Sequence, residues 1–193
     1  MPADDFVFAP APQASLAVQG TDARFPMRRI FCVGRNYEAH AREMGKDPTR
    51  EAPFFFTKPA DAALDTPCTI PYPPQTEDLH HEIELVIAIG KGGRNIAEAD
   101  VMDHVWGASV GIDLTADVPS VERGRIWLAV NGEVRQDADL ADLIWSVREH
   151  VAILSQSMAL APGDIIMTGT PAGVAALVEG DVVTGGVDGI ATL

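Results

Sequence analysis

The chain has 193 residues, a length that fits one domain with a hydrophobic core of ordinary size. Lysine and arginine total 14 against 28 aspartate and glutamate, so the net charge is −14. This balance argues against nucleic acid and anionic membranes as partners, because both require clustered positive charge. A small anionic substrate remains compatible if a few local Arg or Lys residues outweigh the global field.

Cysteine usage and the N-terminus bear on the compartment. Cys32 and Cys68 are too few for a disulfide framework and have no zinc-ligand spacing, so we expect both to be buried in a reduced compartment. The first residues lack the basic and apolar regions of a signal peptide, and no run of 18 apolar residues occurs. We therefore expect a cytoplasmic protein with no membrane partner.

The predicted elements alternate quickly along the chain. Residues 1–28 are rich in Pro and Ala and predict a small strand-bearing arm, and the main body runs from 29 to 193. Many short strands with two or three helices predict an α+β fold that is mostly β. In chain order the body contains a strand at 29–34, a short helix at 37–44, a buried strand at 53–59, an extended connector at 69–75, strands at 81–89 and 105–114 separated by a helix at 96–103, a hairpin around 127–132, a long helix at 140–157, and strands at 164–168 and 181–184.

The stretch 80–89, HHEIELVIAI, has an unusual pattern for a strand. Side chains of a strand alternate with period two, so Glu82 and Glu84 share one face and the isoleucines occupy the other. Two carboxylates on an apolar strand repel each other and lose hydration unless a cation lies between them. The alternative is a strand end that protrudes into solvent. His80 and His81 face opposite ways, so both cannot bind one metal, and we interpret them as supporting or structural groups.

The stretch 106–113, WGASVGID, follows the same design. Small residues lead to Asp113 on one face and leave room beside its carboxylate. The alternative is that Asp113 caps the segment that follows. Three carboxylates on two neighbouring strands would form an oxygen-ligand site suited to Mg²⁺ or Mn²⁺.

A further cluster lies in the predicted helix at 37–44. His40 and Glu43 are three residues apart and therefore neighbours on a helix. A histidine held by a carboxylate can act as a general base on water, although such pairs are usually plain surface contacts.

Six motifs follow one another between residues 34 and 174: G-R-N-Y-x-x-H-x-x-E-M-G, F-x-K-P, H-E-x-E-L, G-x-D-x-T, V-N-G-x-x-R-Q and T-G-T-P-x-G-V. In this order they resemble the fumarylacetoacetate hydrolase family. The segments around 53–56 and 71–82 are most similar to the bacterial fumarylpyruvate hydrolases. The resemblance implies a β-roll of mixed sheets with short helices as the catalytic domain at 29–193, and a homodimer.

The resemblance also implies roles for individual residues. Glu82, Glu84 and Asp113 would bind the metal. His40 and Glu43 would form a water-activating dyad on a short helix that acts as a lid. Arg35 and Lys58 would face the anionic substrate, and Gln136 and Thr170 would bind substrate or support the site.

The sequence departs from the family after Asp113. A relative normally continues through R-D-L-Q to a catalytic lysine, whereas here Thr115-Ala116 runs directly into Asp117-Val118-Pro119, and no lysine follows Lys91. Either an active-site loop near 116–117 is missing from these 193 residues, or the protein has a true deletion and a damaged site. Because every other motif is intact, we favour the first interpretation.

The expected activity follows from the resemblance. It is metal-dependent hydrolysis of the carbon–carbon bond of a small anionic acylpyruvate, above all of fumarylpyruvate to fumarate and pyruvate, in aromatic catabolism. One alternative is oxaloacetate decarboxylation or hydroxymuconate isomerisation at the same site. Another is a catalytically silent homologue that still binds metal.

Overall fold

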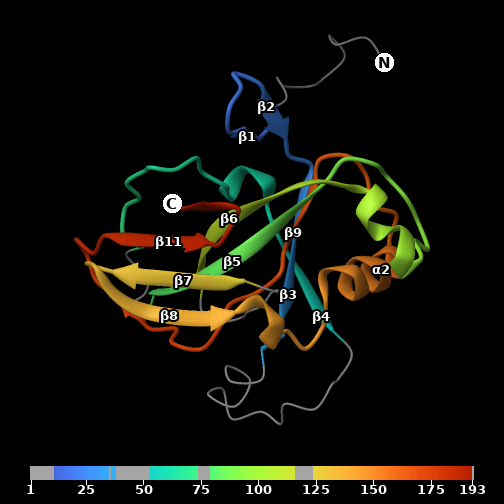
Figure 1. Ribbon diagram of the computed structural model, residues 1–193. Coiled ribbons are helices and arrows are strands. Elements are labelled where there is room, and N and C mark those ends of the chain that lie inside the picture. The colour runs from blue at the N-terminus through green and yellow to red at the C-terminus, as the bar shows by residue number, and fades with distance from the viewer. Residues whose placement is uncertain (1–10, 35, 38–52, 74–78, 116–123, 193) are drawn as a thin grey trace.

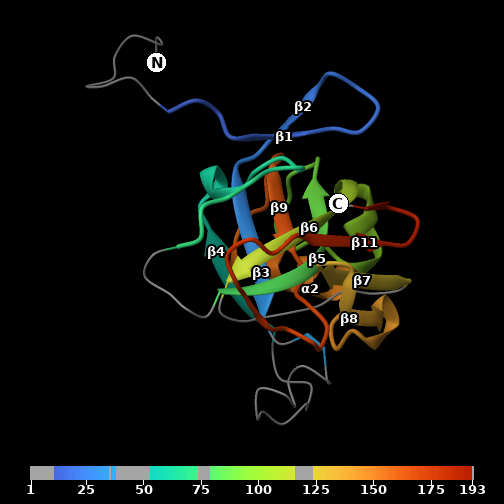
Figure 2. The same cartoon turned by 90° about the vertical axis from the view of Figure 1, so that its left-hand side faces the viewer.

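The computed structural model describes residues 11–34, 36–37, 53–73, 79–115 and 124–192 (Figure 1). A hairpin of β1 (Ser15–Ala17) and β2 (Arg24–Pro26) lies at one end of the body in both views (Figures 1 and 2). This hairpin falls within residues 1–28, where the sequence predicts a strand-bearing arm.

The larger of the two sheets in the body is organised around β5. The strand β6 pairs with β5 along one edge, and β9 and β10 pair with two separate parts of the other edge. The sheet is mixed, because β3 runs parallel to β9 and antiparallel to β4. Its strands are β3 (Arg29–Gly34), β4 (Phe54–Lys58), β5 (Leu79–Ile89), β6 (Val105–Thr115), β9 (Asp164–Met167) and β10 (Ala176–Leu177).

The smaller sheet holds β7 and β8, the predicted hairpin. Its turn is Asn131-Gly132, with φ of 52° and 82°. Two consecutive positive φ values give the turn whose twist matches that of the flanking strands, and Asn-Gly adopts them readily. The hairpin prediction is confirmed. The strands of this sheet are β7 (Arg125–Val130), β8 (Glu133–Asp139), β11 (Val183–Val187) and β12 (Ala191–Thr192).

Helices are few in the described residues. They comprise α2 (Val147–Ser157) and the 3₁₀ turns η1 (Ala60–Ala62), η2 (Glu98–Asp103) and η3 (Leu140–Asp142). The predicted continuous helix at 140–157 is wrong in its first third. Ser146 accepts a hydrogen bond from the backbone N–H of Glu149, and the Glu149 carboxylate accepts one from the N–H of Ser146. This capping box begins the helix at Val147, so the mostly-β fold class is confirmed with even less helix than expected.

The two faces of β5 pack against different clusters. Ile83, Leu85, Ile87 and Ile89 belong to the main hydrophobic core, while Val86 belongs to a second apolar cluster that includes side chains of β3 and β9. The strand is thus buried on both faces. Glu82 and Glu84 continue the face of Val86 toward one end of the strand, so the fold carries both carboxylates into the interior.

Two expectations about burial need correction. Cys32 is buried in β3, but Cys68 is exposed in the connector after η1, so the prediction of burial was wrong for Cys68. The strand predicted as buried at 53–59 is β4, which ends the pairing order of its sheet, and Phe54 is half exposed. In the described part of the chain, no helix is long and apolar enough to cross a membrane.

His150 gives the fold a testable pH dependence. The side chain is fully buried in α2, and burial lowers its pKa from 6.5 to about 4. Between these values the unfolded chain binds the proton more tightly than the folded chain, so acidification from about pH 6.5 to about pH 4 favours unfolding. We expect His150→Leu to remove roughly 3 kcal/mol of this pH dependence. Urea unfolding of both proteins at a series of pH values measures it, and parallel stability profiles would contradict it.

Candidate metal centre

The pairing of β5 with β6 brings three carboxylates together. Glu82 lies directly opposite Asp113 in the antiparallel ladder, and Glu84 lies opposite Gly111. The ligand oxygens of Glu82, Glu84 and Asp113 all lie within 4.8 Å of one another. The exposed fractions of these residues are 0%, 1% and 5%. None of the three points to bulk solvent, so the solvent-exposed strand end considered for Glu82 and Glu84 does not describe this chain.

The electrostatics of this cluster suit a cation. Burial, followed by the charges of Asp113 and Glu82, raises the pKa of Glu84 well above its usual range. Burial also raises the pKa of Asp113, against the opposing effect of Lys58. The Asp113 Oδ2 atom is buried and has no hydrogen-bond partner among the described residues. Three buried carboxylates with an unused oxygen form the hard oxygen donor set that Mg²⁺ and Mn²⁺ prefer.

Gly111, which lies opposite Glu84 in the ladder, occupies a position with little room for a side chain. A Cβ atom added at Gly111 would lie 2.8 Å from Cγ2 of Val86 and 3.3 Å from Cε of Met167. A larger residue would therefore require the Val86 side chain to shift. Among the small residues before Asp113, Gly111 is the one at which the structure requires a small side chain, because nothing lies within 4 Å of an atom added at Gly107.

Lys58 reaches the cluster from β4. Its Nζ atom donates a hydrogen bond to Oδ1 of Asp113 and forms an ion pair with it. The resemblance implies that Lys58 faces an anionic substrate. In the structure its ammonium group contacts a carboxylate of the candidate metal centre, at the partly exposed margin of the cluster.

The T-G-T-P loop packs against β5 beside the carboxylates. The Gly169 N–H donates to the Glu84 carboxylate, and both the N–H and the hydroxyl of Thr168 donate to the Leu85 carbonyl. Thr170 and Gln136 are fully buried and hydrogen-bonded to each other. Sequence reasoning named Thr170 and Gln136 but missed Thr168 and Gly169, although their motif was visible. The Gly169 contact is made by a backbone N–H, which every residue except proline has, so no residue type in the sequence identifies it.

Three predicted site residues, Arg35, His40 and Glu43, lie outside the described residues, as do residues 38–44 of the helix predicted to carry His40 and Glu43. Tyr37, where that helix was predicted to begin, instead forms a β-bridge with Leu143. Within the same motif Asn36 is described and buried, and its side chain donates to the Trp145 carbonyl at 2.8 Å. This part of the motif is therefore anchored next to the start of α2.

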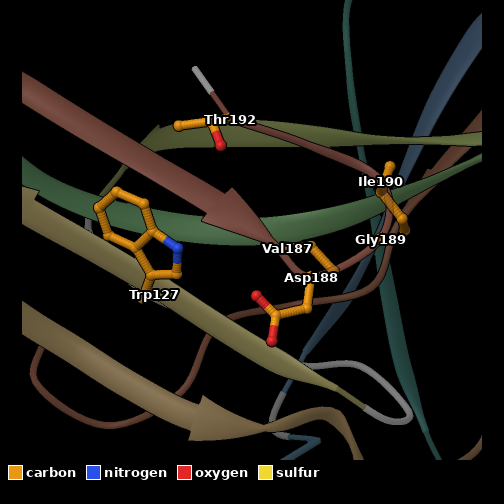
Figure 3. Close-up of a pocket in the computed structure, with 6 residues that line it drawn as sticks. All are labelled: Trp127, Val187, Asp188, Gly189, Ile190 and Thr192. Carbon is orange, nitrogen blue, oxygen red and sulfur yellow. The ribbon is translucent and has the colours of Figure 1, made fainter.

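A shallow pocket lies elsewhere, around the turn between β11 and β12 (Figure 3). It is lined by Trp127, Val187, Asp188, Gly189, Ile190 and Thr192. Its one charged lining residue is a carboxylate, so it does not favour an anionic ligand. None of its residues belongs to the candidate metal centre.

Comparison with known proteins identifies the family to which the chain belongs. The model of the fumarylacetoacetate (FAA) hydrolase C-terminal domain matches residues 29–123 and 116–193. The chain belongs to the fumarylacetoacetate hydrolase family. The resemblance given by the six motifs is confirmed.

Three relatives illustrate the range of this family. A fumarylpyruvate hydrolase from a Ralstonia species is 37% identical over 179 residues, covering 76% of this chain and 93% of that protein. The crystal structure of fumarylpyruvate hydrolase from Pseudomonas aeruginosa in complex with Mn²⁺ and pyruvate is 42% identical, with a TM-score of 0.91 and coverage of 98% and 97% of the two chains. The bovine mitochondrial oxaloacetate tautomerase FAHD1 is 33% identical over 199 residues, covering 86% of this chain and 90% of that protein.

The family model matches this chain in two overlapping parts. Both matches include residues 116–123, which follow β6 directly. The bovine alignment spans 199 residues yet includes only 86% of this 193-residue chain, so the relative has residues with no counterpart here. Residues 116–123 themselves lie outside the described residues, and the expected gap between Thr115 and Pro119 stays a prediction.

Gly173 of the T-G-T-P-x-G motif offers a test of how the loop is held. Its φ is +98°, and an added Cβ atom would lie 2.1 Å from the Arg135 carbonyl oxygen. We expect Gly173→Ala to destabilise the protein by about 2 to 5 kcal/mol, from φ strain plus the displaced backbone. Gly180→Ala is the matched control, because its φ is +94° and nothing lies within 4 Å of the added atom. Urea unfolding compares them, and equal losses would exclude the close approach as the cause.

Proposed function

We propose that this chain is a divalent-metal-dependent hydrolase that cleaves the carbon–carbon bond of an acylpyruvate, with fumarylpyruvate as the first candidate. The observation that carries the proposal is the convergence of Glu82, Glu84 and Asp113 within 4.8 Å in the interior of the fold. The similarity to the Pseudomonas enzyme supports it, because that structure contains both a divalent metal, Mn²⁺, and pyruvate, the product that hydrolysis of an acylpyruvate would release.

In this proposal the three carboxylates hold one Mg²⁺ or Mn²⁺ ion. When bound, the cation supplies positive charge to the pyruvoyl oxygens and to the enolate that develops as the bond breaks. Lys58 and Arg35 add positive charge for an anionic substrate, which the net charge of −14 would otherwise repel.

The chain's own residues supply the proton transfer. His40, oriented by Glu43, takes a proton from water, and the resulting hydroxide attacks the carbonyl distal to the pyruvate portion. Collapse of the tetrahedral adduct breaks the carbon–carbon bond, and the leaving enolate takes up a proton. One water is consumed, and fumarylpyruvate gives fumarate and pyruvate. The roles of His40, Glu43 and Arg35 rest on the G-R-N-Y-x-x-H-x-x-E-M-G motif.

A second candidate reaction uses the same carboxylates. The bovine relative is named an oxaloacetate tautomerase, and oxaloacetate chemistry through an enolate requires no attacking water. Purified protein should be assayed with Mg²⁺ or Mn²⁺ against several acylpyruvates and oxaloacetate. Formation of two organic acids supports hydrolysis. Release of CO₂ or tautomer exchange from oxaloacetate, with no acylpyruvate cleaved, would replace the hydrolase proposal.

The segment after β6 decides whether the site is complete. We propose that the protein has a further active-site loop near residues 116–117, in keeping with the two-part match to the family model. The intact mass of the natural protein tests this proposal. A mass near 20.6 kDa would indicate a true deletion and favour a silent metal-binding homologue. The homodimer and the cytoplasmic location remain predictions.

A further inference from the structure

The edge of β5 that faces away from β6 has an interrupted ladder of strand pairing. On this edge β9 pairs with residues 86–88 and β10 pairs with residues 79–80. On this edge no described strand pairs with residues 81–85, which include Glu82 and Glu84; on the opposite edge the same residues pair with β6. A buried backbone N–H or C=O in such a gap must find a partner other than a strand.

Side chains and a loop fill this gap. The Leu85 carbonyl accepts from the N–H and hydroxyl of Thr168, which continues from β9. The Ile83 N–H donates to Oε1 of Gln136 at 3.3 Å, across from β8 of the other sheet. Gln136 therefore takes the place of a strand directly behind Glu82.

The orientation of the Gln136 amide follows from its backbone partners. The Ile83 N–H is a donor, so the atom that faces it must be the oxygen, and the Pro171 carbonyl at 2.7 Å requires the NH₂ group. The same oxygen lies 3.2 Å from Nδ1 of His81, which must therefore carry its proton on Nδ1. The Gln136 oxygen thus accepts two hydrogen bonds, from Ile83 and His81, and its NH₂ group donates two, to Pro171 and Thr170.

The contact with Thr170 determines the direction of that hydroxyl. Nε2 of Gln136 donates to Oγ1 of Thr170 at 2.6 Å, so the Thr170 oxygen is the acceptor and its own proton remains available for donation to another group. Thr170 follows Gly169, whose N–H contacts Glu84. One buried amide thus holds both the strand that carries the carboxylates and the loop beside them.

We propose that Gln136 is a positioning residue, which holds β5 on both sides of Glu82, through the Ile83 N–H and the His81 ring, and orients the Thr170 hydroxyl as a donor. It does not contact substrate itself, because its amide has no hydrogen-bonding position left. The inference rests on the proposed function, in which Glu82 binds the metal, and on the family resemblance, which implies that Thr170 binds substrate or supports the site. Gln136 would thus have two separate effects. Through β5 it would affect metal binding, and through the T-G-T-P loop it would affect substrate binding.

The test titrates metal-free protein with Mn²⁺ by calorimetry, and then the Mn²⁺-loaded protein with pyruvate. We expect Gln136→Met to raise the Kd for Mn²⁺ by about 10-fold to 100-fold, as loss of groups that orient metal ligands typically does. Thr170→Val should leave the Kd for Mn²⁺ within about twofold and weaken pyruvate binding by about tenfold, the loss of one buried hydrogen bond. Val134→Met, at an exposed position of the same strand, is the control and should change neither.

The outcomes separate this inference from the proposed function. A folded Gln136→Met variant with the Mn²⁺ affinity of the wild type overturns the positioning role and leaves the function intact. A purely structural role would lower the melting temperature without changing the Kd. Failure of the wild type to bind Mn²⁺ overturns the proposed function and this inference with it. If Gln136→Met does not fold, Gln136→Asn replaces it, because the shorter amide cannot reach both β5 and the loop, and the same loss of affinity is expected.

Discussion

Glu84→Gln is expected to abolish metal binding and to stabilise the metal-free protein. The substituted amide would keep the shape of the Glu84 side chain but remove a carboxyl group whose charged form is disfavoured by burial and by the charges of Asp113 and Glu82, which raise its pKa. We expect the affinity for Mn²⁺ to fall by more than about 100-fold, since even groups that only orient ligands account for 10-fold to 100-fold. The melting temperature of the metal-free protein should rise by about 2 to 4 °C for each kcal/mol of repulsion relieved.

The opposite signs of these two effects make the prediction specific. Calorimetric titration with Mn²⁺ and thermal unfolding without metal measure them on the same preparation. Glu179→Gln removes the same charge from an exposed position and should change neither quantity. A Glu84→Gln variant that binds Mn²⁺ like the wild type would remove Glu84 from the ligand set. A destabilised metal-free variant would show that the hydrogen bond from the Gly169 N–H to the carboxylate contributes more to stability than the repulsion costs.

His40→Ala is expected to lower turnover of the acylpyruvate by about 10² to 10⁴ while leaving Mn²⁺ affinity nearly unchanged. General-base assistance contributes a factor of that size, and His40 is not among the proposed ligands. Steady-state kinetics at saturating Mn²⁺ gives the first quantity, and calorimetry gives the second. His104→Ala, which removes a histidine whose ring contacts the Lys91 carbonyl, is the control.

The outcome of the His40 experiment also distinguishes the candidate reactions. Hydrolysis needs an activated water, whereas decarboxylation of oxaloacetate does not. Retention of oxaloacetate turnover with loss of acylpyruvate cleavage would assign His40 to the water. Loss of Mn²⁺ affinity with turnover retained would reverse the assignment and make His40 a ligand.

The local sequence pattern was enough to predict the strands that carry the candidate metal centre. The alternation along 80–89 predicts which face of β5 bears Glu82 and Glu84, because period two follows from backbone geometry alone. Asn131-Gly132 predicts the hairpin for the same local reason. The capping box of Ser146 and Glu149 was equally visible in the sequence, and the helix prediction failed there because the apolar pattern was read without it.

Contacts between distant segments could not be predicted in this way. Gln136 contacts β5 from another sheet, 53 residues away from Ile83 in sequence, and nothing in V-N-G-x-x-R-Q specifies that register. The ion pair between Lys58 and Asp113 likewise depends on how β4 and β6 are placed within one sheet. The family resemblance names such residues as important, but only the packing of the sheets distinguishes a residue that contacts ligand from one that supports it.

The two-sided burial of β5 limits how this protein can evolve new chemistry. A shift of β5 by one residue against β6 would turn Glu82 and Glu84 into the main core and bring Ile83 to the metal side. We therefore expect an insertion or deletion within this strand to disrupt both the hydrophobic core and the carboxylate cluster. Descendants of such a protein must diversify by substitutions at fixed positions and by changes in the segments that follow β6. Relatives named for hydrolysis and for tautomerisation would then share one alignment of their carboxylates and differ in what surrounds it.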